Sequence, residues 1–368
     1  VAGTIAGTCI GGGATVGTAQ LAGTVGLSAW WFTIGTGLAL VIMGLFYAKP
    51  LRGTALETIA QYLVLNYGKG AGHFTTVVSS LGIFFSAVAS CLPGIAILAA
   101  LTGMPSWAAA LPAFPWFSLI GNGVQNALVS VFSLLVGVLC TQSYIQAIFS
   151  ASNPRTASIG AFTAALITIP VGLPCALIGM YMHVAHPEVA PLLALPAYLL
   201  TEAPAVLGSI AMGGILLSLV GSIAGLSLGI GTMLTRGIFT KVFHVEGASA
   251  ELRLSRIVVL GVILAACAFS LANEGSQVLF WNYLSMALRG GGIFLPLTVA
   301  VFRPHAVSAR VALMSMILST LTAVVAAAMH TSVSPLFIGL GVSVITLLPG
   351  LFGGHHDDDD EQPVMVED

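Results

Sequence analysis

The chain has 368 residues, of which 57% are hydrophobic and only 7% are charged, and its mean hydropathy is +1.02. This composition excludes a soluble globular protein and indicates an all-α integral membrane protein, with the lipid bilayer as its surroundings. The net charge is −2 and the basic residues are scattered rather than clustered, which argues against nucleic acid as a partner.

The first apolar stretch, residues 3–26, is uncharged and long enough to span a bilayer, yet eight of its 24 residues are glycine. Gly11, Gly12 and Gly13 are consecutive. Each interior glycine disfavours helix by about 1 kcal/mol relative to alanine, so we expect the helix to break here. Transporters use such breaks to hold ions and substrates. The alternative is that the glycines only permit close helix packing.

Further apolar stretches follow, and with the first they make about ten predicted spans. The others cover residues 27–48, 72–101, 121–150, 156–184, 206–243, 254–271, 276–301, 306–328 and 336–352. Residues 56–67 are predicted to form a short helix along the membrane surface, and residues 104–114 are too short to cross. We therefore expect a transmembrane domain over residues 1–353 and a disordered acidic tail over residues 354–368.

The basic residues predict the orientation. Ten of them lie on the same side of the predicted membrane: Lys49, Arg52, Lys69, Arg155, Arg236, Lys241, Arg253, Arg256, Arg303 and Arg310. Because short cytoplasmic loops carry the lysines and arginines, the first residue and the acidic tail are predicted to be cytoplasmic. The exception is Arg289, in the middle of the eighth span. The chain begins with Val1 rather than Met, so we expect its N-terminus to be incomplete.

Several stretches resemble the sodium:solute symporter family in the right order. They are TVGTAQLAGTVGLSAWWF from Thr15 onward, TALETIAQYLVLNYG from Thr54 onward, and residues 142–146, 239–243 and 296–310. The resemblance implies a LeuT-like fold of two inverted five-helix repeats with discontinuous first helices, in a prokaryotic inner membrane. One departure is that the family's helix pair between the third and fourth spans has only residues 104–114 in its place.

The resemblance also implies a function, which is sodium-coupled symport of a small organic solute by alternating access. Some relatives use this membrane module as a sensor, so a sensory or non-transporting module is the alternative. A sensor should continue into a soluble signalling domain, whereas only the acidic tail follows the last span. The sequence carries no nucleophile–base constellation, phosphate loop or paired catalytic carboxylates, so we do not expect an enzyme. The oligomeric state is left open.

By the same resemblance, sodium is held between the first repeat helix and the sixth span. Carried over residue by residue, its ligands are the carbonyl groups of Gly7, Ile10 and Ile223 and the hydroxyl of Ser227. A second hydroxyl is expected at position 226, where this chain has leucine. Ser222 lies one helical turn before position 226 on the same face, which keeps a shifted alignment open. A serine that bonds back to its own helix is the alternative for Ser227.

The resemblance places the solute against the broken segment, at Gly11, Gly12, Gly13 and Thr15, and against the fourth span, at Gln142. For Gln142 a hydrogen bond between helices is the alternative. The family positions that bind sugars are apolar or glycine here, so a sugar is not expected.

Arg289 has no acidic residue in the predicted membrane core to pair with, and Gly290, Gly291 and Gly292 directly follow it. We expect a second helix break at these glycines. An intramembrane charge is a candidate functional residue, and an arginine fork suits the carboxylate of an organic or amino-acid-like solute. The alternatives are that Arg289 is a fixed positive charge at a place where relatives bind a cation, that backbone carbonyls cap it, or that it extends to the interface.

Overall fold

The structure is a computed structural model that describes residues 1–54, 56–100, 116, 118–242, 244–245, 247–273, 276–329 and 333–352. Side chains are described for these residues except 87–100, 241, 327–328 and 350–352. The predicted short segment at 104–114 and the predicted acidic tail at 354–368 lie outside the described residues.

Within the described ranges every regular element is helical. The helices are α1 (Ala2–Cys9), η1 (Gly13–Gly17), α2 (Thr18–Val25), η2 (Gly26–Trp30), α3 (Trp31–Ile42), η3 (Met43–Tyr47), α4 (Ala48–Gly53), α5 (Ile59–Ala100), α7 (Val124–Leu139), α8 (Gln142–Phe149), α9 (Pro154–Ala185), η4 (Pro191–Leu193), α10 (Ala194–Thr201), α11 (Ala205–Leu234), η5 (Thr235–Phe239), α12 (Thr240–Val242), α13 (Ala248–Leu271), α14 (Val278–Phe302), α15 (Ala309–Ala328) and α16 (Pro335–Phe352).

Six of the described helices are long and apolar enough to cross a membrane, or seven if the bent pair α7–α8 is taken as one span. The sequence predicted about ten. The two counts differ partly because residues 13–53, where the sequence analysis placed parts of two spans, are counted together as one, although Gly26 leaves the helical conformation between α2 and η2 with φ 63° and ψ −146°. Within α5, Gly68 has a non-helical backbone with φ 76° and ψ 178°, and this kink separates the part that corresponds to the predicted surface helix at 56–67 from the part that corresponds to the third span.

The predicted break in the glycine-rich segment is confirmed. Helix α1 ends at Cys9, and Ile10 leaves the helical region with φ −84° and ψ 59°. The chain becomes helical again at Gly13, where a π-helical turn leads into α2. The glycine triplet therefore separates two half-helices, as its helix-breaking cost predicts.

A second break, which the sequence analysis did not predict, divides residues 121–150 into α7 and α8. The two helices meet at an angle of 47°. Thr141, between them, has an extended backbone with φ −84° and ψ 115°, and its hydroxyl donates to the Gly137 carbonyl at 2.8 Å. The polar run that begins at Thr141 is the sequence signal for this break.

The break predicted at Gly290–Gly292 is wrong, because α14 is continuous from Val278 to Phe302. The three glycines serve close packing instead. A Cβ on Gly290 would lie 2.5 Å from a methyl of Val136 in α7, and a side chain on Gly292 would overlap Thr320 of α15. Small residues at helix contacts let membrane helices approach closely.

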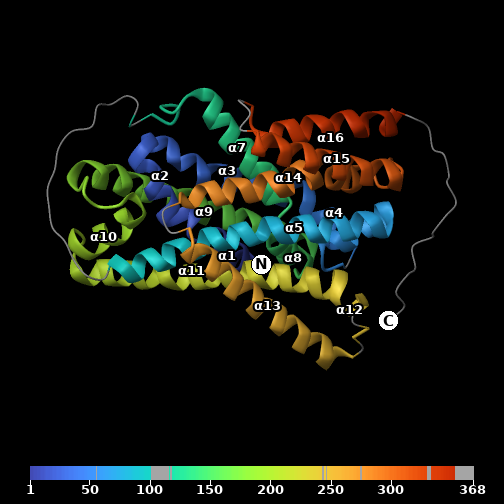
Figure 1. Cartoon of the computed structure of the whole chain (residues 1–368), viewed down its shortest axis with the longest axis horizontal. Helices are drawn as coiled ribbons and strands as arrows, with labels where there is room; N and C mark the ends of the chain where they lie inside the picture. Colours follow the sequence, from blue (N-terminus) through green and yellow to red (C-terminus); the bar gives the residue numbers. More distant parts are fainter. Residues whose placement is uncertain are drawn as a thin grey trace.

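Helix α14 is the centre of the arrangement. In Figure 1 it runs through the middle of the molecule, with α15 and α16 on one side and α11 and α13 on the other, and it packs against α5, α7, α15 and α16. The hydroxyls of Tyr62 and Tyr67 in α5 donate to the carbonyls of Ala300 and Pro296 in α14, at 3.3 and 3.0 Å. These bonds fix α5 against α14.

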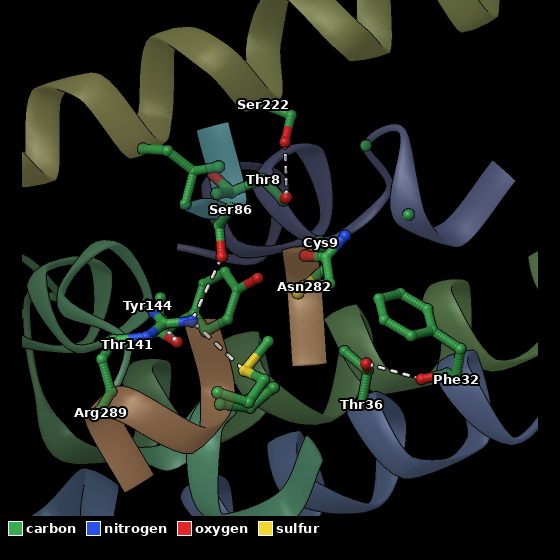
Figure 2. Close-up of a pocket in the computed structure, with 15 residues that line it drawn as sticks. Thr8, Cys9, Phe32, Thr36, Ser86, Thr141, Tyr144, Ser222, Asn282 and Arg289 are labelled. Carbon is green, nitrogen blue, oxygen red and sulfur yellow. Dashed lines mark hydrogen bonds between the residues drawn. The ribbon is translucent and has the colours of Figure 1, made fainter. Parts of the chain in front are cut away.

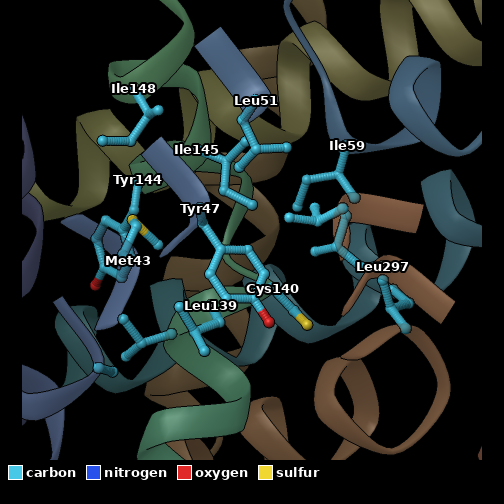
Figure 3. Close-up of a cluster of buried hydrophobic side chains, with 14 of the residues drawn as sticks. Met43, Tyr47, Leu51, Ile59, Leu139, Cys140, Tyr144, Ile145, Ile148 and Leu297 are labelled. Atoms are coloured by element: carbon cyan, nitrogen blue, oxygen red, sulfur yellow. The ribbon is translucent and has the colours of Figure 1, made fainter. Parts of the chain in front are cut away.

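A buried apolar cluster supports the second break. Figure 3 shows Met43, Tyr47 and Leu51 around the end of α3 and α4, packed against Ile145 and Ile148 of α8. Leu51 and Ile145 are fully buried. Because α8 is short, this packing, rather than its own hydrogen bonds, determines where it lies.

Candidate functional site

A cavity lies where the two helix breaks meet (Figure 2). It is lined by Thr8, Cys9, Gly11 and Gly13 from the first break, Val138, Thr141 and Tyr144 from the second, Asn282, Met286 and Arg289 of α14, and Phe32, Thr36, Ser86, Ser222 and Leu226. Its volume is about 30 Å³, which is room for one or two water molecules. The cavity is therefore almost closed in this conformation.

Arg289 is fully buried in the wall of this cavity. Its Nε donates to the Ser285 carbonyl at 3.2 Å, and one terminal nitrogen donates to the Thr141 hydroxyl at 2.8 Å. The other terminal nitrogen donates to the hydroxyls of Ser285 and Ser86, at 2.9 and 3.3 Å. Among the described residues every hydrogen-bond acceptor is thus neutral. Neutral acceptors lower the cost of burying the guanidinium, but they do not neutralise its charge.

Glycine in α5 makes room for this arginine. A Cβ on Gly82 would lie 2.5 Å from Cγ of Arg289. The Ser285 hydroxyl also donates to the Gly82 carbonyl. The arginine, its serine partner and α5 therefore form one closely packed unit.

Oxygen atoms gather between α1 and α11. The Ser222 hydroxyl donates to the Thr8 carbonyl at 3.0 Å, and the Ser218 hydroxyl donates to the Ile10 carbonyl. Gly225 faces the Thr8 side chain, because a Cβ there would lie 2.6 Å from the Thr8 hydroxyl. Two carbonyls and three hydroxyls at the end of a broken helix are the kind of oxygen-rich place that holds sodium in transporters.

The structure brings only part of the predicted sodium set to this place. Gly7 lies on α1 and Ile10 directly follows this helix, but outside the helix's own backbone no described atom lies within 4 Å of a Cβ built on Gly7. Ile223 packs with the apolar cluster around Ile83. Ser227 is fully buried and its hydroxyl has no hydrogen-bond partner among the described residues. Five residues along a helix turn the direction by about 140°, so Ser227 does not share the face of Ser222 that meets α1.

Only some of the residues predicted to bind the solute line the cavity. Gly11 and Gly13 line the cavity, whereas Gly12 and Thr15 do not. The Gly12 carbonyl accepts from the backbone of Gly17 at 2.7 Å, and the Thr15 hydroxyl donates to the Gly11 carbonyl at 3.0 Å. Both residues thus stabilise the restart of the helix.

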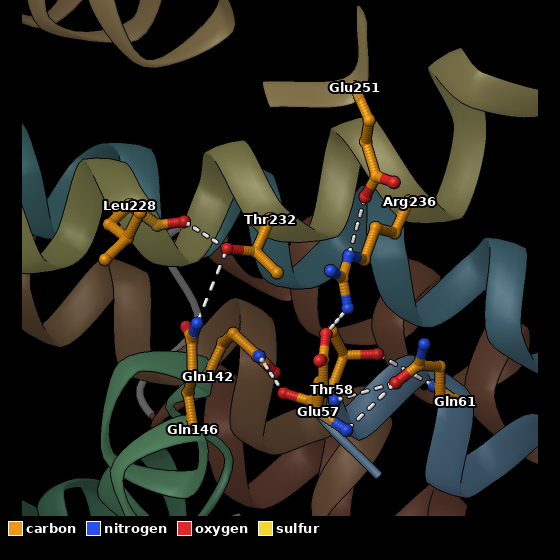
Figure 4. A network of polar contacts seen from close by, with 9 residues as sticks. All are labelled: Glu57, Thr58, Gln61, Gln142, Gln146, Leu228, Thr232, Arg236 and Glu251. Atoms are coloured by element: carbon orange, nitrogen blue, oxygen red, sulfur yellow. Dashed lines mark hydrogen bonds and ion pairs between the residues drawn. The ribbon is translucent and has the colours of Figure 1, made fainter. Parts of the chain in front are cut away.

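Gln142 joins α8 to the start of α5 (Figure 4). Its side-chain oxygen accepts from the Ile59 backbone amide and its nitrogen donates to the Glu57 carbonyl, each at 3.0 Å. Gln142 is fully buried and does not line the cavity. The helix-to-helix role that the sequence analysis kept as the alternative describes these contacts.

An ion-pair network continues from Glu57. Arg236 contacts the carboxylate of Glu57 and, at 2.8 Å, that of Glu251 in α13 (Figure 4). Beside it lies a larger cavity of about 720 Å³, which Arg52 and Gln146 also line. It opens among residues on the side that the basic residues predict to be cytoplasmic.

The cavity at the two breaks includes polar residues that the sequence analysis did not single out. Thr141, Ser86 and Ser285 hold the arginine, and Asn282 lines the cavity one helical turn before Met286. A polar residue four or seven positions from Arg289 in an apolar helix is the signal that would have indicated Asn282.

Comparison with known proteins finds transporters that this chain resembles. No family model matches the chain. The human high affinity choline transporter 1 is 28% identical over 190 residues, which are 44% of this chain and 28% of that transporter. The high-affinity choline transporter 1 of Torpedo marmorata is 33% identical over 144 residues, which are 38% of this chain and 22% of that transporter. The chain thus spans less than a third of the length of either relative.

The structural comparison covers more of the chain. A Na⁺-coupled sialic acid symporter, solved in a substrate-bound outward-open state, superposes with a TM-score of 0.69 over 95% of this chain and 88% of that chain, at 15% identity. This likeness confirms the predicted all-helical symporter fold. The three relatives are transporters, in agreement with the prediction that the chain is not an enzyme.

Proposed function

We propose that this chain is a member of the sodium:solute symporter family and a secondary active transporter that carries a small organic anion together with sodium by alternating access. The solute class we propose is a carboxylate or an amino-acid-like compound. The observation that carries the proposal is Arg289, a fully buried cation with only neutral described partners, in the wall of the cavity where the two helix breaks meet.

The charge of Arg289 supports one of the two kinds of solute for which the matched transporters are named. Two relatives are named for choline, which is a cation, and one for sialic acid, which carries a carboxylate. Charges interact more strongly in a buried site than in water, so a buried guanidinium repels a quaternary ammonium and attracts a carboxylate. The planar guanidinium also matches a carboxylate with two parallel hydrogen bonds. We therefore favour an anion over choline.

Sodium is the proposed co-substrate. The carbonyls of Thr8 and Ile10 and the hydroxyls of Ser218 and Ser222 offer oxygen ligands at the end of α1. The set carried over from the family, with Gly7, Ile10, Ile223 and Ser227, stays a prediction. The contacts between α1 and α11 favour Ser222, and the two assignments differ in a mutational test given below.

The small size of the cavity supports the proposal of alternating access. A volume of about 30 Å³ admits one or two waters but no organic solute, so the walls must move for a solute to bind. The cavity walls belong to two broken helices, whose short halves can move separately. The larger cavity around Arg52 and Gln146 would give the solute a path beside α8 from the side that is predicted to be cytoplasmic.

Uptake by proteoliposomes tests the proposal. Vesicles with an inward sodium gradient would receive a panel of labelled compounds: short carboxylates, amino acids, sialic acid and choline. An inward potassium gradient is the control. We expect uptake of at least one carboxylate that depends on sodium, and no uptake of choline. Sodium-driven choline uptake, or carboxylate uptake at equal rates with potassium, would overturn the proposal. Carboxylate binding without uptake under any gradient would support the non-transporting alternative.

A further inference from the structure

A second polar side chain faces the same cavity as Arg289, on the same helix. Asn282, Met286 and Arg289 are separated by four and three residues on α14, so they share one helix face, and all three line the cavity. Figure 2 draws Asn282 and Arg289 among the residues around this space. The proposed function uses the arginine but leaves the asparagine without a role.

The side chain of Asn282 is buried and unpaired. It is 8% exposed, and it makes no hydrogen bond to another described residue, whereas the neighbouring hydroxyls of Thr36 and Ser222 both do. Its amide offers two N–H donors and one carbonyl acceptor. Buried polar groups in folded proteins are nearly always hydrogen-bonded, so an unpaired amide that faces a cavity indicates a ligand group that completes it.

The position of Asn282 is fixed by its neighbours. Gly13 at the first helix break leaves room for the amide, since a Cβ there would lie 2.6 Å from Nδ2 of Asn282 and 2.9 Å from Cζ of Phe32. The first turn of α14 is tied to α2, because the Gln20 side-chain oxygen accepts from the Val278 backbone amide at 2.9 Å. The amide is thus held in place before a ligand arrives, which lowers the entropic cost of binding.

The distance between the Arg289 guanidinium and the Asn282 amide limits how far apart the two polar groups of the ligand can be. Side chains on a helix point back toward its N-terminus, and the Arg289 guanidinium contacts Ser285 and Met286, about one turn before its own Cα. The guanidinium and the Asn282 amide are therefore separated along α14 by about one further turn, roughly 5 Å. A carboxylate and a second polar group three or four bonds apart span this distance.

The charge of the cavity limits the second group. Arg289 is the only cationic side chain among the described residues that line it. If the second polar group of the solute were another carboxylate, its negative charge would be buried against the neutral amide of Asn282. A hydroxyl or amide group of the solute would form hydrogen bonds with this amide without burying a further charge. Among the described lining residues, a quaternary ammonium would find no anion to pair with.

We propose that Asn282 recognises an uncharged hydrogen-bonding group of the solute, a hydroxyl or an amide, while Arg289 binds its carboxylate. The solute would then be a short hydroxy- or amido-monocarboxylate. This inference rests on the proposed function for the carboxylate end, and Asn282 acts as a specificity-determining residue at the other end.

The experiment compares pairs of probes that differ only in the second group. Binding of 4-hydroxybutanoate and butanoate, and of succinamate and succinate, would be measured by calorimetry on the full chain in detergent with saturating sodium. We expect the wild-type protein to prefer 4-hydroxybutanoate and succinamate by about tenfold each, since the matching group completes the buried amide. In Asn282→Leu the two members of each pair should bind with about equal affinity, and butanoate binding should be retained.

Two further variants control for the substitution itself and for misfolding. Asn126→Leu makes the same change at an exposed asparagine of α7 and should leave the tenfold preference unchanged. Asn282→Ala adds no bulk beside Gly13 and should give the same result as Asn282→Leu, so it replaces that variant if leucine prevents folding. A preference that survives in Asn282→Ala would overturn the inference.

The outcomes also separate this inference from the proposed function. If the wild-type protein binds butanoate and 4-hydroxybutanoate equally, the inference about Asn282 is wrong while carboxylate recognition by Arg289 stands. If the wild-type protein binds none of the four probes and no other carboxylate, the proposed function itself fails.

Discussion

Arg289 donates a hydrogen bond of 2.8 Å to the hydroxyl of Thr141, and this contact joins α14 to the break between α7 and α8. The next residue, Gln142, bonds to the backbone at Ile59 and Glu57, where α5 begins. The proposed solute carboxylate would therefore lie beside the break between α7 and α8. Gln142 connects this break to the start of α5.

The first prediction concerns the arginine fork. Arg289→Lys should keep the charge but lose the two parallel hydrogen bonds, so carboxylate affinity should fall by about tenfold. Arg289→Gln should abolish carboxylate binding while the protein stays folded, because glutamine removes the costly buried charge and keeps N–H donors for the neutral acceptors around it. Calorimetry and thermal unfolding of both variants measure the two effects. Wild-type affinity in Arg289→Gln would remove the arginine from the solute site.

The second prediction concerns the sodium ligands. Ser222→Ala should raise the sodium concentration for half-maximal uptake by about tenfold or more, because a bond to a charged group contributes about 1.5–3 kcal/mol. Leu226→Ser should lower that concentration, since position 226 lines the cavity and gains an oxygen. Ser227→Ala should have the larger effect only if the alignment to the family motif is right. Unchanged sodium activation in all three variants would place the coupling ion elsewhere.

The third prediction concerns Gln142. Gln142→Leu leaves the Ile59 amide and the Glu57 carbonyl without their partner, so it should destabilise the protein by about 2 kcal/mol or more. Gln146→Leu is the matched control, because its amide makes only a 3.5 Å contact with Thr232. Thermal unfolding compares the two. A Gln142→Leu protein of normal stability but altered solute affinity would instead support the solute-binding role predicted from the sequence.

The fourth prediction concerns pH at the end of α9. His186 lies between two carboxylates, 3.0 Å from Glu188 and 3.4 Å from Glu202, and the Tyr181 hydroxyl also donates to Glu202. A hydrogen bond from its own backbone amide, and then the contact with His186, hold the pKa of the Glu188 carboxyl below its usual value of 4.5. A lowered folded-state pKa means that the stabilisation is complete above pH 4.5 and is lost as the pH falls further.

Glu188→Gln should therefore lower the unfolding temperature slightly at neutral pH and not at all well below pH 4.5. The effect should be small because the Glu188 side chain is 47% exposed. Unfolding temperatures of both proteins between pH 3 and pH 7 check this. A difference between the proteins that grows as the pH falls would contradict the assigned contact.

Two glycine triplets show how far the sequence predicts this fold. Both triplets, at Gly11–Gly13 and at Gly290–Gly292, favour a break by their local cost, and only the first one breaks. The second lies where α7, α15 and α16 approach α14, so packing holds the helix together. The break at Thr141 is the opposite case, because contacts with Arg289 and α5 create it without any glycine triplet.

The residues of the candidate site also fall into those that the sequence could identify and those that it could not. Arg289 could be found from the sequence because a charge in an apolar helix is visible without knowing its neighbours. Asn282, Ser86 and Thr141 could not, since their roles depend on which helix faces meet at the cavity. The choice between Ser222 and Ser227 is also a question of helix face, and a motif alignment alone does not settle it.

The most direct test of the account is accumulation of a carboxylate against its own gradient. Proteoliposomes with the wild-type protein would be loaded with the carboxylate that the uptake panel identifies and given an inward sodium gradient. We expect the internal concentration to rise above the external one, a sodium ionophore to release the excess, and Arg289→Gln vesicles never to exceed equilibrium. Accumulation that persists after the sodium gradient is collapsed, or equal accumulation in Arg289→Gln, would contradict sodium-coupled transport through this site.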